Sequence, residues 1–350
     1  MRRRTLLESK PGGGPDGSTA TPLSVVLAKK SDSSLIIVDG NSWSSSAYPS
    51  SAYTPVGIVV IPGEHGVLKS GDGKTNQCGV MSIVPMSYSS PETGATSETS
   101  MYWGYNSLDI SSKSDSLGRY DSISYGLRNY NNVITTSNNT SNTGTALSSS
   151  TYAHIPRQAA ENGTPTRSSS PYAPSPYAGS DYKSGAYNTS YGTTSYDSGS
   201  NYNALADFGG IVNTKIITDL STSWKTGSIS NSYNTSGVYP AAQTCARYHT
   251  TGTKAFKDCT TDELKNGTGF WYLPAAGELG YIVPRLYDIN ATITKLNGAY
   301  GVGVLLGTNN LYWSSSEYSD NGAYGVYTGS GGVNYGYKYN SRYVRAFLRL

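Results

Sequence analysis

The sequence predicts an α+β protein in which a β-rich N-terminal domain precedes a C-terminal domain of mixed helices and strands. Short β-branched runs separated by Gly, Pro, Asp and Ser fill the first part, and no helical period occurs before about residue 205. Beyond that point, apolar residues recur every three or four positions, as on the buried face of a helix. The length of 350 residues agrees with roughly two domains.

These patterns divide the chain into four parts. Residues 1–22 end in PGGGPDGSTATP and are expected to form a flexible N-terminal arm. Residues 23–160 are the β-rich domain, although its part 86–150 is so rich in Ser, Thr, Asn and Tyr that no element is assigned there. Residues 161–203 are a Tyr-, Ser- and Pro-rich strap or linker, and residues 204–350 are the C-terminal domain.

Four apolar runs of the β-rich domain have the length and composition of strands. They are Leu23–Leu27, Leu35–Val38, Val56–Ile61 and Val80–Val84. Each contains Val or Ile and is bounded by residues that favour turns, which predicts a sheet of short strands joined by loops.

In the C-terminal domain, helices are predicted over Thr214–Trp224 and Tyr239–His249, and a buried strand over Phe270–Leu273. A longer helical stripe runs over residues 275–296, and Pro284 within it should kink the helix or begin a second one. The last fifty residues are expected to contain only strands and loops.

Composition excludes several classes of function. Charged residues make up 14% of the chain and the net charge is +3, so a nucleic-acid partner held by bulk electrostatics is not expected. No apolar run reaches the ~18 residues of a membrane span, and no apolar stretch of a signal peptide follows the basic start, so neither insertion nor ordinary secretion is expected. Three cysteines without a CxxC pair predict no disulfide framework and no metal site, with Cys245 a small buried residue.

Tyrosine is the compositional outlier, with 31 Tyr against 4 Phe and 5 Trp. Tyrosine beside Gly, Ser and Asn is typical of recognition surfaces, because the ring is large and rigid and carries a polar tip. The alternative is a low-complexity adhesive segment. In the strap, tyrosines recur about every five residues, which predicts an extended segment held on another surface, with a disordered linker as the alternative; they are Tyr172, Tyr177, Tyr182, Tyr187, Tyr191, Tyr196 and Tyr202.

Three motifs near the C-terminus follow one another in order: WYLPAAGELGYI at Trp271–Ile282, YWSSSEY at Tyr312–Tyr318 and VRAF at Val344–Phe347. As a set they resemble the variable proteins of diversity-generating retroelements, found in gut Bacteroides and their phages. The resemblance covers about residues 204–350 and implies a C-type-lectin-like fold. The scaffold residues that it implies are Trp271, Leu273, Pro274, Glu278, Leu279, Trp313, Val344 and Phe347.

In that family, error-prone reverse transcription at adenines rewrites codons between the second and third motifs. Asn codons altered in this way give Tyr, Ser, Gly, Asp and Thr among others, but never Lys. Residues 318–341 consist almost wholly of these types. Val326 and Val333 resemble fixed strand positions, and Lys338 breaks the rule and is therefore expected to be invariant.

The residues themselves support a binding surface in this segment. Tyr335, Tyr337 and Tyr339 alternate with smaller residues and would share one face of a strand. A glycine-rich hairpin with incidental tyrosines is the alternative. The predicted ligand-binding residues are Tyr318, Ser319, Asp320, Asn321, Tyr324, Gly325, Tyr327, Thr328, Asn334, Tyr335, Gly336, Tyr337, Tyr339, Asn340 and Ser341.

The expected function is hypervariable ligand binding, at the tip of a phage tail fibre, to a protein or glycan of the bacterial surface. The N-terminal part would join other virion proteins, and a homotrimer is expected by analogy with tail-tip proteins. The alternatives are a structural virion protein and a bacterial surface adhesin. A formylglycine-generating enzyme is disfavoured because residues 260–350 contain no cysteine, so no catalytic residue and no cofactor are expected.

Overall fold

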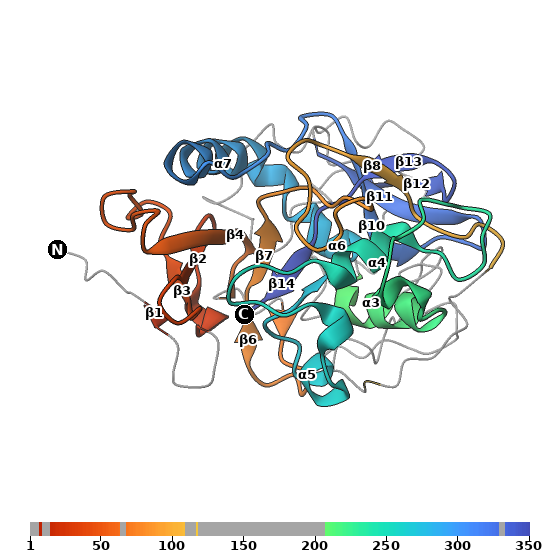
Figure 1. Cartoon of the computed structure of the whole chain (residues 1–350), viewed down its shortest axis with the longest axis horizontal. Helices are drawn as coiled ribbons and strands as arrows, with labels where there is room; N and C mark the ends of the chain where they lie inside the picture. The colour runs from red at the N-terminus through yellow and green to blue at the C-terminus, as the bar shows by residue number, and fades with distance from the viewer. Residues whose placement is uncertain (1–6, 9–14, 64–67, 109–116, 118–206, 329–332) are drawn as a thin grey trace, which may run out of the picture.

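The computed structural model describes residues 7–8, 15–63, 68–108, 117, 207–328 and 333–350. It is a mixed α+β structure, mostly sheet with few helices, and its N-terminal part is β-rich (Figure 1). The predicted strap at 161–203 and most of the predicted arm at 1–22 lie outside the described residues.

A seven-stranded antiparallel sheet has the order β1-β3-β2-β4-β7-β14-β9. The four predicted N-terminal strands are confirmed: β3 has the predicted bounds, and β2, β4 and β7 have shifted ends. Val and Ile on both faces of these strands are buried, because the sheet is covered on both sides. The strand bounds are β1 Leu7–Glu8, β2 Val25–Lys29, β3 Leu35–Val38, β4 Tyr53–Ile61, β7 Gly79–Ser82, β9 Trp271–Tyr272 and β14 Phe347–Arg349.

A second sheet has five strands in the order β12-β11-β10-β13-β8. Its pairs are antiparallel except β10 with β13, where Tyr312 lies opposite Tyr343 in a parallel pair. The bounds are β8 Ser100–Tyr102, β10 Leu311–Glu317, β11 Gly322–Tyr327, β12 Val333–Tyr337 and β13 Ser341–Tyr343. A separate ribbon pairs β5 Leu68–Lys69 with β6 Asn76–Gln77.

Both large sheets combine strands from the two predicted domains. The final strand β14 lies between β7 of the N-terminal part and β9 of the C-terminal part. Likewise β13 pairs with β8, so Ser341 lies opposite Tyr102. The predicted boundary near residue 204 therefore does not separate two sheets, and the C-terminal segments are built onto the N-terminal ones (Figure 1).

The helices follow the predicted pattern in part: the helix expected over Thr214–Trp224 is α3, which begins at Gly210 and ends at Asp219, so that Trp224 lies in the following 3-10 turn. The stripe at 275–296 is interrupted as expected: Pro284 lies in the 3-10 turn Val283–Arg285, which separates α6 from α7. In the second predicted helix, Pro240 occupies the first turn, where no backbone donor is needed. The helices are α3 Gly210–Asp219, α4 Pro240–Arg247, α5 Thr261–Asn266, α6 Ala276–Gly280 and α7 Leu286–Tyr300, and the other 3-10 turns are Gly17–Thr19, Ser223–Lys225 and Phe256–Asp258.

The apolar pattern from Tyr343 to Leu350 predicts a single core strand, and this prediction is wrong. The run is split between β13 and β14, which belong to different sheets. Arg345 lies in the crossing between them, completely buried, and its guanidinium group reaches Glu98 Oε1 at 2.5 Å and the Val304 carbonyl at 2.8 Å. On either side of Arg345 the backbone already bonds to the end of β7 and the segment after it. The Val344 carbonyl accepts from the Met86 N–H at 3.0 Å, and the Ala346 carbonyl accepts from the Ser82 N–H at 2.9 Å.

Candidate functional site: a tyrosine surface on the five-stranded sheet

The eight predicted scaffold residues are all buried. Trp313 is fully enclosed and its indole N–H donates to the Met101 carbonyl at 3.1 Å. Glu278, on α6, accepts hydrogen bonds from Tyr272 at 2.8 Å and Arg349 at 2.7 Å, and burial raises the pKa of its carboxyl group. The eight scaffold residues hold α6, β9, β10 and β14 together, and we call these eight residues the frame.

Two of the three serines of YWSSSEY fix the five-stranded sheet to the helices, and the first bonds within the sheet. The pairing of β10 with β11 is irregular between Trp313 and Glu317, which leaves the intervening serines free to bond elsewhere. Ser314 Oγ donates to the Tyr324 carbonyl at 2.7 Å. Ser315 Oγ accepts from Asn213 of α3 at 3.1 Å, and Ser316 Oγ accepts from the Ala276 N–H at 3.0 Å.

Asp207 completes this buried network. Its carboxylate accepts from Ser316 Oγ at 2.6 Å, from Asn213 Nδ2 at 2.8 Å and from the Gly209 N–H at 2.8 Å. Burial raises the pKa of Asp207 to about 7, against the opposing effect of these three hydrogen bonds. The Asp207 carboxyl group therefore loses its proton near neutral pH, at the buried contact between α3 and β10.

Lys338 is the buried centre of the segment that was predicted to vary. Its side chain is fully shielded, and its three ammonium donors reach Glu317 Oε1 at 2.5 Å and the carbonyls of Asp320 at 2.8 Å and Leu108 at 3.0 Å. The ammonium also lies 4.8 Å from the centroid of a Trp103 ring. One lysine thus joins β10, the β10–β11 turn and the segment after β8.

The register of β11 and β12 shows which tyrosines share a face. Tyr324 lies opposite Tyr335, and Gly322 lies opposite Tyr337, so Tyr335 and Tyr337 project on the same side as Tyr324. The predicted alternation is confirmed for Tyr335 and Tyr337. Tyr339 was expected in the same strand, but it follows the end of β12 in a tight turn.

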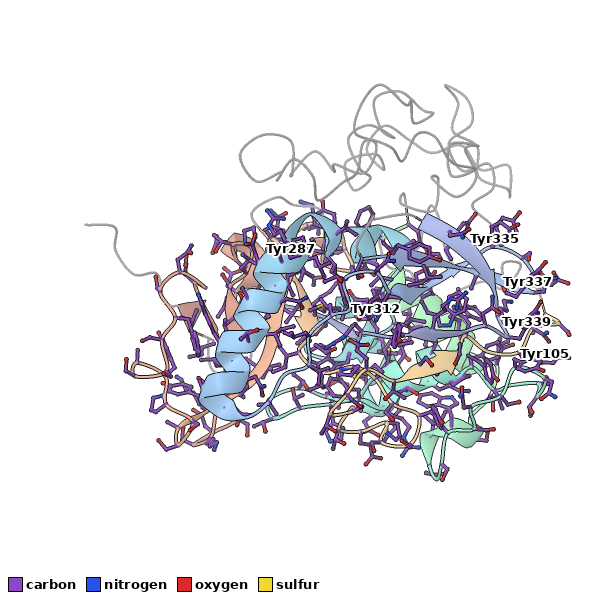
Figure 2. The ribbon with its side chains drawn as sticks, turned by 90° about the horizontal axis from the view of Figure 1, so that it is seen from above. Tyr105, Tyr287, Tyr312, Tyr335, Tyr337 and Tyr339 are labelled. Atoms are coloured by element: carbon purple, nitrogen blue, oxygen red, sulfur yellow. The ribbon has the colours of Figure 1, made fainter. Side chains whose placement is uncertain are left out.

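The rings nevertheless form one continuous band. Tyr318 stacks on Tyr335 with centroids 4.0 Å apart, and Tyr337 stacks on Tyr339 at 4.9 Å. Tyr335, Tyr337 and Tyr339 are 40%, 46% and 40% exposed, and they follow one another along one end of the molecule (Figure 2). Such flat, half-exposed rings offer contact area at little entropic cost.

Two further tyrosines, which the sequence patterns do not identify, extend the band. Tyr233 lies 5.7 Å from Tyr339, and Tyr102 of β8 lies 5.0 Å from Tyr233, measured between ring centroids. The segment SNSYNTSG around Tyr233 has the composition used to find the others, but its place beside β12 depends on long-range folding. We call Tyr102, Tyr233, Tyr318, Tyr335, Tyr337 and Tyr339 the tyrosine surface.

Several predicted binding residues lie outside this surface. Tyr324 is completely buried beneath Tyr318, with centroids 5.5 Å apart. Thr328 is buried and its hydroxyl donates to the Gly307 carbonyl at 2.5 Å. A Cβ added to Gly325 would lie 2.8 Å from the Tyr312 carbonyl oxygen, so this glycine is required by packing. These three residues belong with the frame.

Strand alternation separates others from the surface. Gly336 faces Trp313, and a Cβ there would lie 3.0 Å from its ring. By the same alternation Asn334 and Tyr327 project away from Tyr335 and Tyr337. The polar residues that remain exposed or half-exposed beside the tyrosine surface lie in the two turns and at the start of β13: Ser319, Asp320, Asn321, Asn340 and Ser341.

The described residues contain no group of three side chains suited to hold a metal ion. In the same part of the chain no helix is long and apolar enough to cross a bilayer. The three cysteines are free, and Cys245 is fully buried as predicted. Burial raises the pKa of Cys78 and of Cys259 to about 12, which disfavours the thiolate form that redox chemistry would need.

Comparison with known proteins gives little beyond this geometry. No protein-family model matches the chain, and no curated protein matches it. Among solved structures, a fimbrial protein from Bacteroides ovatus ATCC 8483 is similar, with a TM-score of 0.41 and 14% sequence identity. The match covers 94% of this chain and 49% of the fimbrial protein, so this chain spans about half the length of that structure.

Proposed function

We propose that this protein is a hypervariable ligand-binding protein that binds its target through the tyrosine surface. The observation that carries the proposal is the row formed by Tyr335 and Tyr337 on β12 and Tyr339 in the turn after it, which are 40–46% exposed above supporting residues that are buried. Recognition surfaces are usually mounted in this way, on a rigid scaffold that does not depend on the displayed side chains. A few such aromatic residues can supply most of the energy of an interface.

The burial of Lys338 supports the diversity-generating retroelement assignment. Adenine rewriting of an Asn codon cannot yield lysine, so Lys338 should be fixed, and its full burial against Glu317 gives a physical reason for that. The exposed neighbours Tyr337 and Tyr339 have types that rewriting can produce. The proposed fold of residues 204–350 is C-type-lectin-like, although its sheets also take in N-terminal strands.

We place the protein at the tip of a phage tail fibre, where it would bind a protein or glycan on a bacterial surface. In this arrangement the N-terminal part contacts other virion proteins, and a homotrimer would add avidity. A bacterial surface adhesin is the second candidate, since the tyrosine surface would serve it equally well.

The proposal is tested by flow cytometry of the fluorescently labelled full chain on intact cells of a panel of Bacteroides strains. A triple variant, Tyr335→Ser, Tyr337→Ser and Tyr339→Ser, should lose binding to every strain that the wild type binds. Tyr287→Ser is the matched control, because Tyr287 is 74% exposed on α7, well apart from the tyrosine surface in Figure 2. Equal binding by the triple variant and the control would refute the proposal.

A further inference from the structure

A surface hollow lies away from the frame, between two segments that are far apart in sequence. Residues 88–93, between β7 and β8, form one wall, and residues 227–229, before α4, form the other. Its volume of about 560 Å³ is within the roughly 300–1,000 Å³ of small-molecule sites. None of its lining residues belongs to the tyrosine surface or to the predicted ligand-binding residues.

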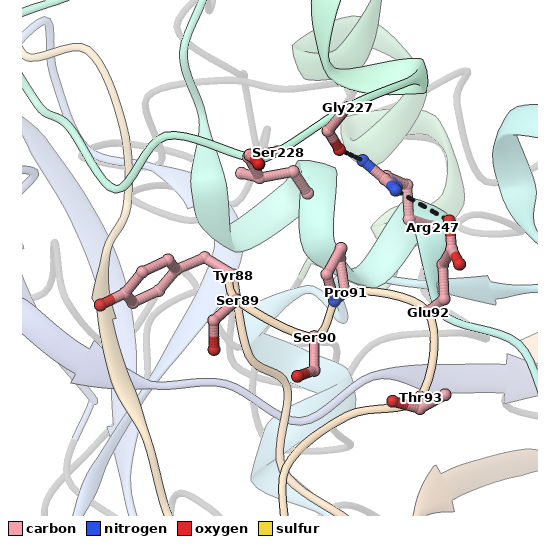
Figure 3. A pocket seen from close by; sticks show the side chains of 10 residues that line it. Tyr88, Ser89, Ser90, Pro91, Glu92, Thr93, Gly227, Ser228 and Arg247 are labelled. Carbon is pink, nitrogen blue, oxygen red and sulfur yellow. Dashed lines mark hydrogen bonds and ion pairs between the residues drawn. The ribbon is translucent and has the colours of Figure 1, made fainter.

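Arg247, at the end of α4, joins the two walls. Its Nη1 donates to the Gly227 carbonyl at 2.5 Å, and its Nη2 donates to Glu92 Oε1 at 2.8 Å (Figure 3). The Arg247 side chain is 8% exposed, and its Nε is buried without a hydrogen-bond partner among the described residues. The hollow is thus held in shape by a guanidinium group, and its Nε is too buried to reach a ligand.

Glu92 presents a fixed hydrogen-bond acceptor on the wall formed by residues 88–93. Its side chain is 50% exposed, and the hydrogen bond from Arg247 lowers the pKa of its carboxyl group, so the group is ionised at neutral pH. The Glu92 carbonyl accepts from the His249 N–H at 3.2 Å, which fixes the backbone. Only Oε1 is bonded to Arg247, and Oε2 can accept from a ligand.

The rest of the lining is hydroxyl-rich. Ser89, Ser90, Thr93 and Ser228 are exposed there, while Tyr88 and Pro91 add partly covered apolar surface. Hydroxyl groups and a carboxylate oxygen match the alternating donors and acceptors of vicinal hydroxyls. Tyr88 also packs against the hydrophobic core, and Pro91 offers apolar surface to the C–H face of a sugar ring.

Charge decides between classes of polar ligand. Arg247 and Glu92 are the charged residues of the lining, and they neutralise each other at 2.8 Å. A sialylated, sulfated or phosphorylated ligand would meet a paired guanidinium group and a carboxylate that repels it. Lys257, whose charge also acts on Glu92, lies outside the lining and is paired with Asp258. We infer that this hollow is a binding site for a neutral glycan, with Glu92, Ser90 and Ser228 as its hydrogen-bonding residues.

The inference does not rest on the tyrosine surface, and its test separates the two. The full chain is applied to an array of neutral oligosaccharides, their sialylated and sulfated counterparts, and unstructured peptides. We expect binding to at least one neutral oligosaccharide, and saturation-transfer NMR then measures the affinity for that glycan. The triple tyrosine variant should bind it as the wild type does.

Two variants locate the site. Ser228→Leu removes a hydroxyl and fills the hollow, and Glu92→Ala removes the acceptor; each should weaken binding at least tenfold. Ser230→Leu is the matched control, because Ser230 is also exposed on the same segment but does not line the hollow. Thermal unfolding confirms that each variant is folded. The inference is overturned if no neutral glycan binds, if anionic glycans or peptides bind instead, or if Ser228→Leu behaves as Ser230→Leu does.

Discussion

The ammonium group of Lys338 lies 2.5 Å from Glu317 Oε1, and both side chains are completely shielded from solvent. This ion pair sits within the segment that displays Tyr337 and Tyr339. A buried pair contributes little net stability compared with an apolar pair, but loss of one partner leaves an uncompensated charge. The pair therefore constrains what can replace either residue, while its exposed neighbours remain free to change.

The first prediction concerns this pair. Lys338→Met should lower the free energy of unfolding by about 3–5 kcal/mol, because Glu317 is left charged and buried. Adding Glu317→Gln should recover part of the loss. Lys74→Met is the control: Lys74 forms an ion pair with Asp72 but is 82% exposed, and its loss should cost at most about 1 kcal/mol. Urea unfolding measures all four proteins, and equal losses for Lys338→Met and Lys74→Met would contradict the prediction.

The second prediction compares two tyrosines that face each other across β11 and β12. Tyr324→Ser should destabilise the protein by about 3 kcal/mol, because a fully buried ring leaves a cavity. Tyr335→Ser should change the free energy of unfolding by at most about 1 kcal/mol, because this ring is 40% exposed. Thermal unfolding compares the two, and similar losses would show that both tyrosines are structural.

The third prediction tests the core of the five-stranded sheet. Trp313→Ala should cost about 3–5 kcal/mol, since the indole is fully buried and hydrogen-bonded to Met101. Tyr287→Ala on α7 should be nearly neutral. The difference is measured by chemical denaturation, and a loss below about 1 kcal/mol for Trp313→Ala would mean that the frame does not depend on this side chain.

The fourth prediction concerns pH. The pKa of Asp207 is about 7 in the folded protein, above its ordinary value of 3.8, so between these values the folded state holds a proton that the unfolded state has lost. The proton on Asp207 therefore stabilises the folded state at about pH 4, and this stabilisation is lost as the pH rises to 7. The resulting fall in the free energy of unfolding is up to about 4 kcal/mol.

Asp207→Asn should remove that dependence. Urea unfolding at intervals from pH 4 to pH 7 should show the wild type losing stability relative to the variant. Asp219→Asn is the control, because the Asp219 side chain is 57% exposed. If the wild type and Asp207→Asn show parallel pH profiles, the carboxyl group of Asp207 titrates normally.

Local patterns of the sequence predicted much of the fold. The apolar runs of β2, β3, β4 and β7 were found because strands covered on both faces are continuously apolar, and the break at Pro284 follows from its missing N–H group. The pairing of β14 with β7 could not be predicted, since the two are separated by most of the chain and no local signal marks a partner.

The candidate site was predicted in part for a related reason. Residue type identified the tyrosine-rich segment, but burial separates Tyr324 from Tyr335 although both have the same type and face. What distinguishes them is the Tyr318 ring, which covers one and stacks beside the other. Tyr233 reaches the surface only through the fold of the segment before α4, which carries no helical or strand period.

The central claim is that exposed tyrosines bind while the buried frame holds them independently of their identity. The most direct test is a display library in which Tyr335, Tyr337 and Tyr339 are randomised together, and Tyr324, Gly325 and Thr328 are randomised in a parallel library. Each library is selected separately for protease resistance and for binding to Bacteroides cells that the wild type binds. Nearly all variants at 335, 337 and 339 should resist protease while few retain binding, and most variants at 324, 325 and 328 should fail the protease selection. Protease sensitivity throughout the first library, or full tolerance in the second, would contradict the account.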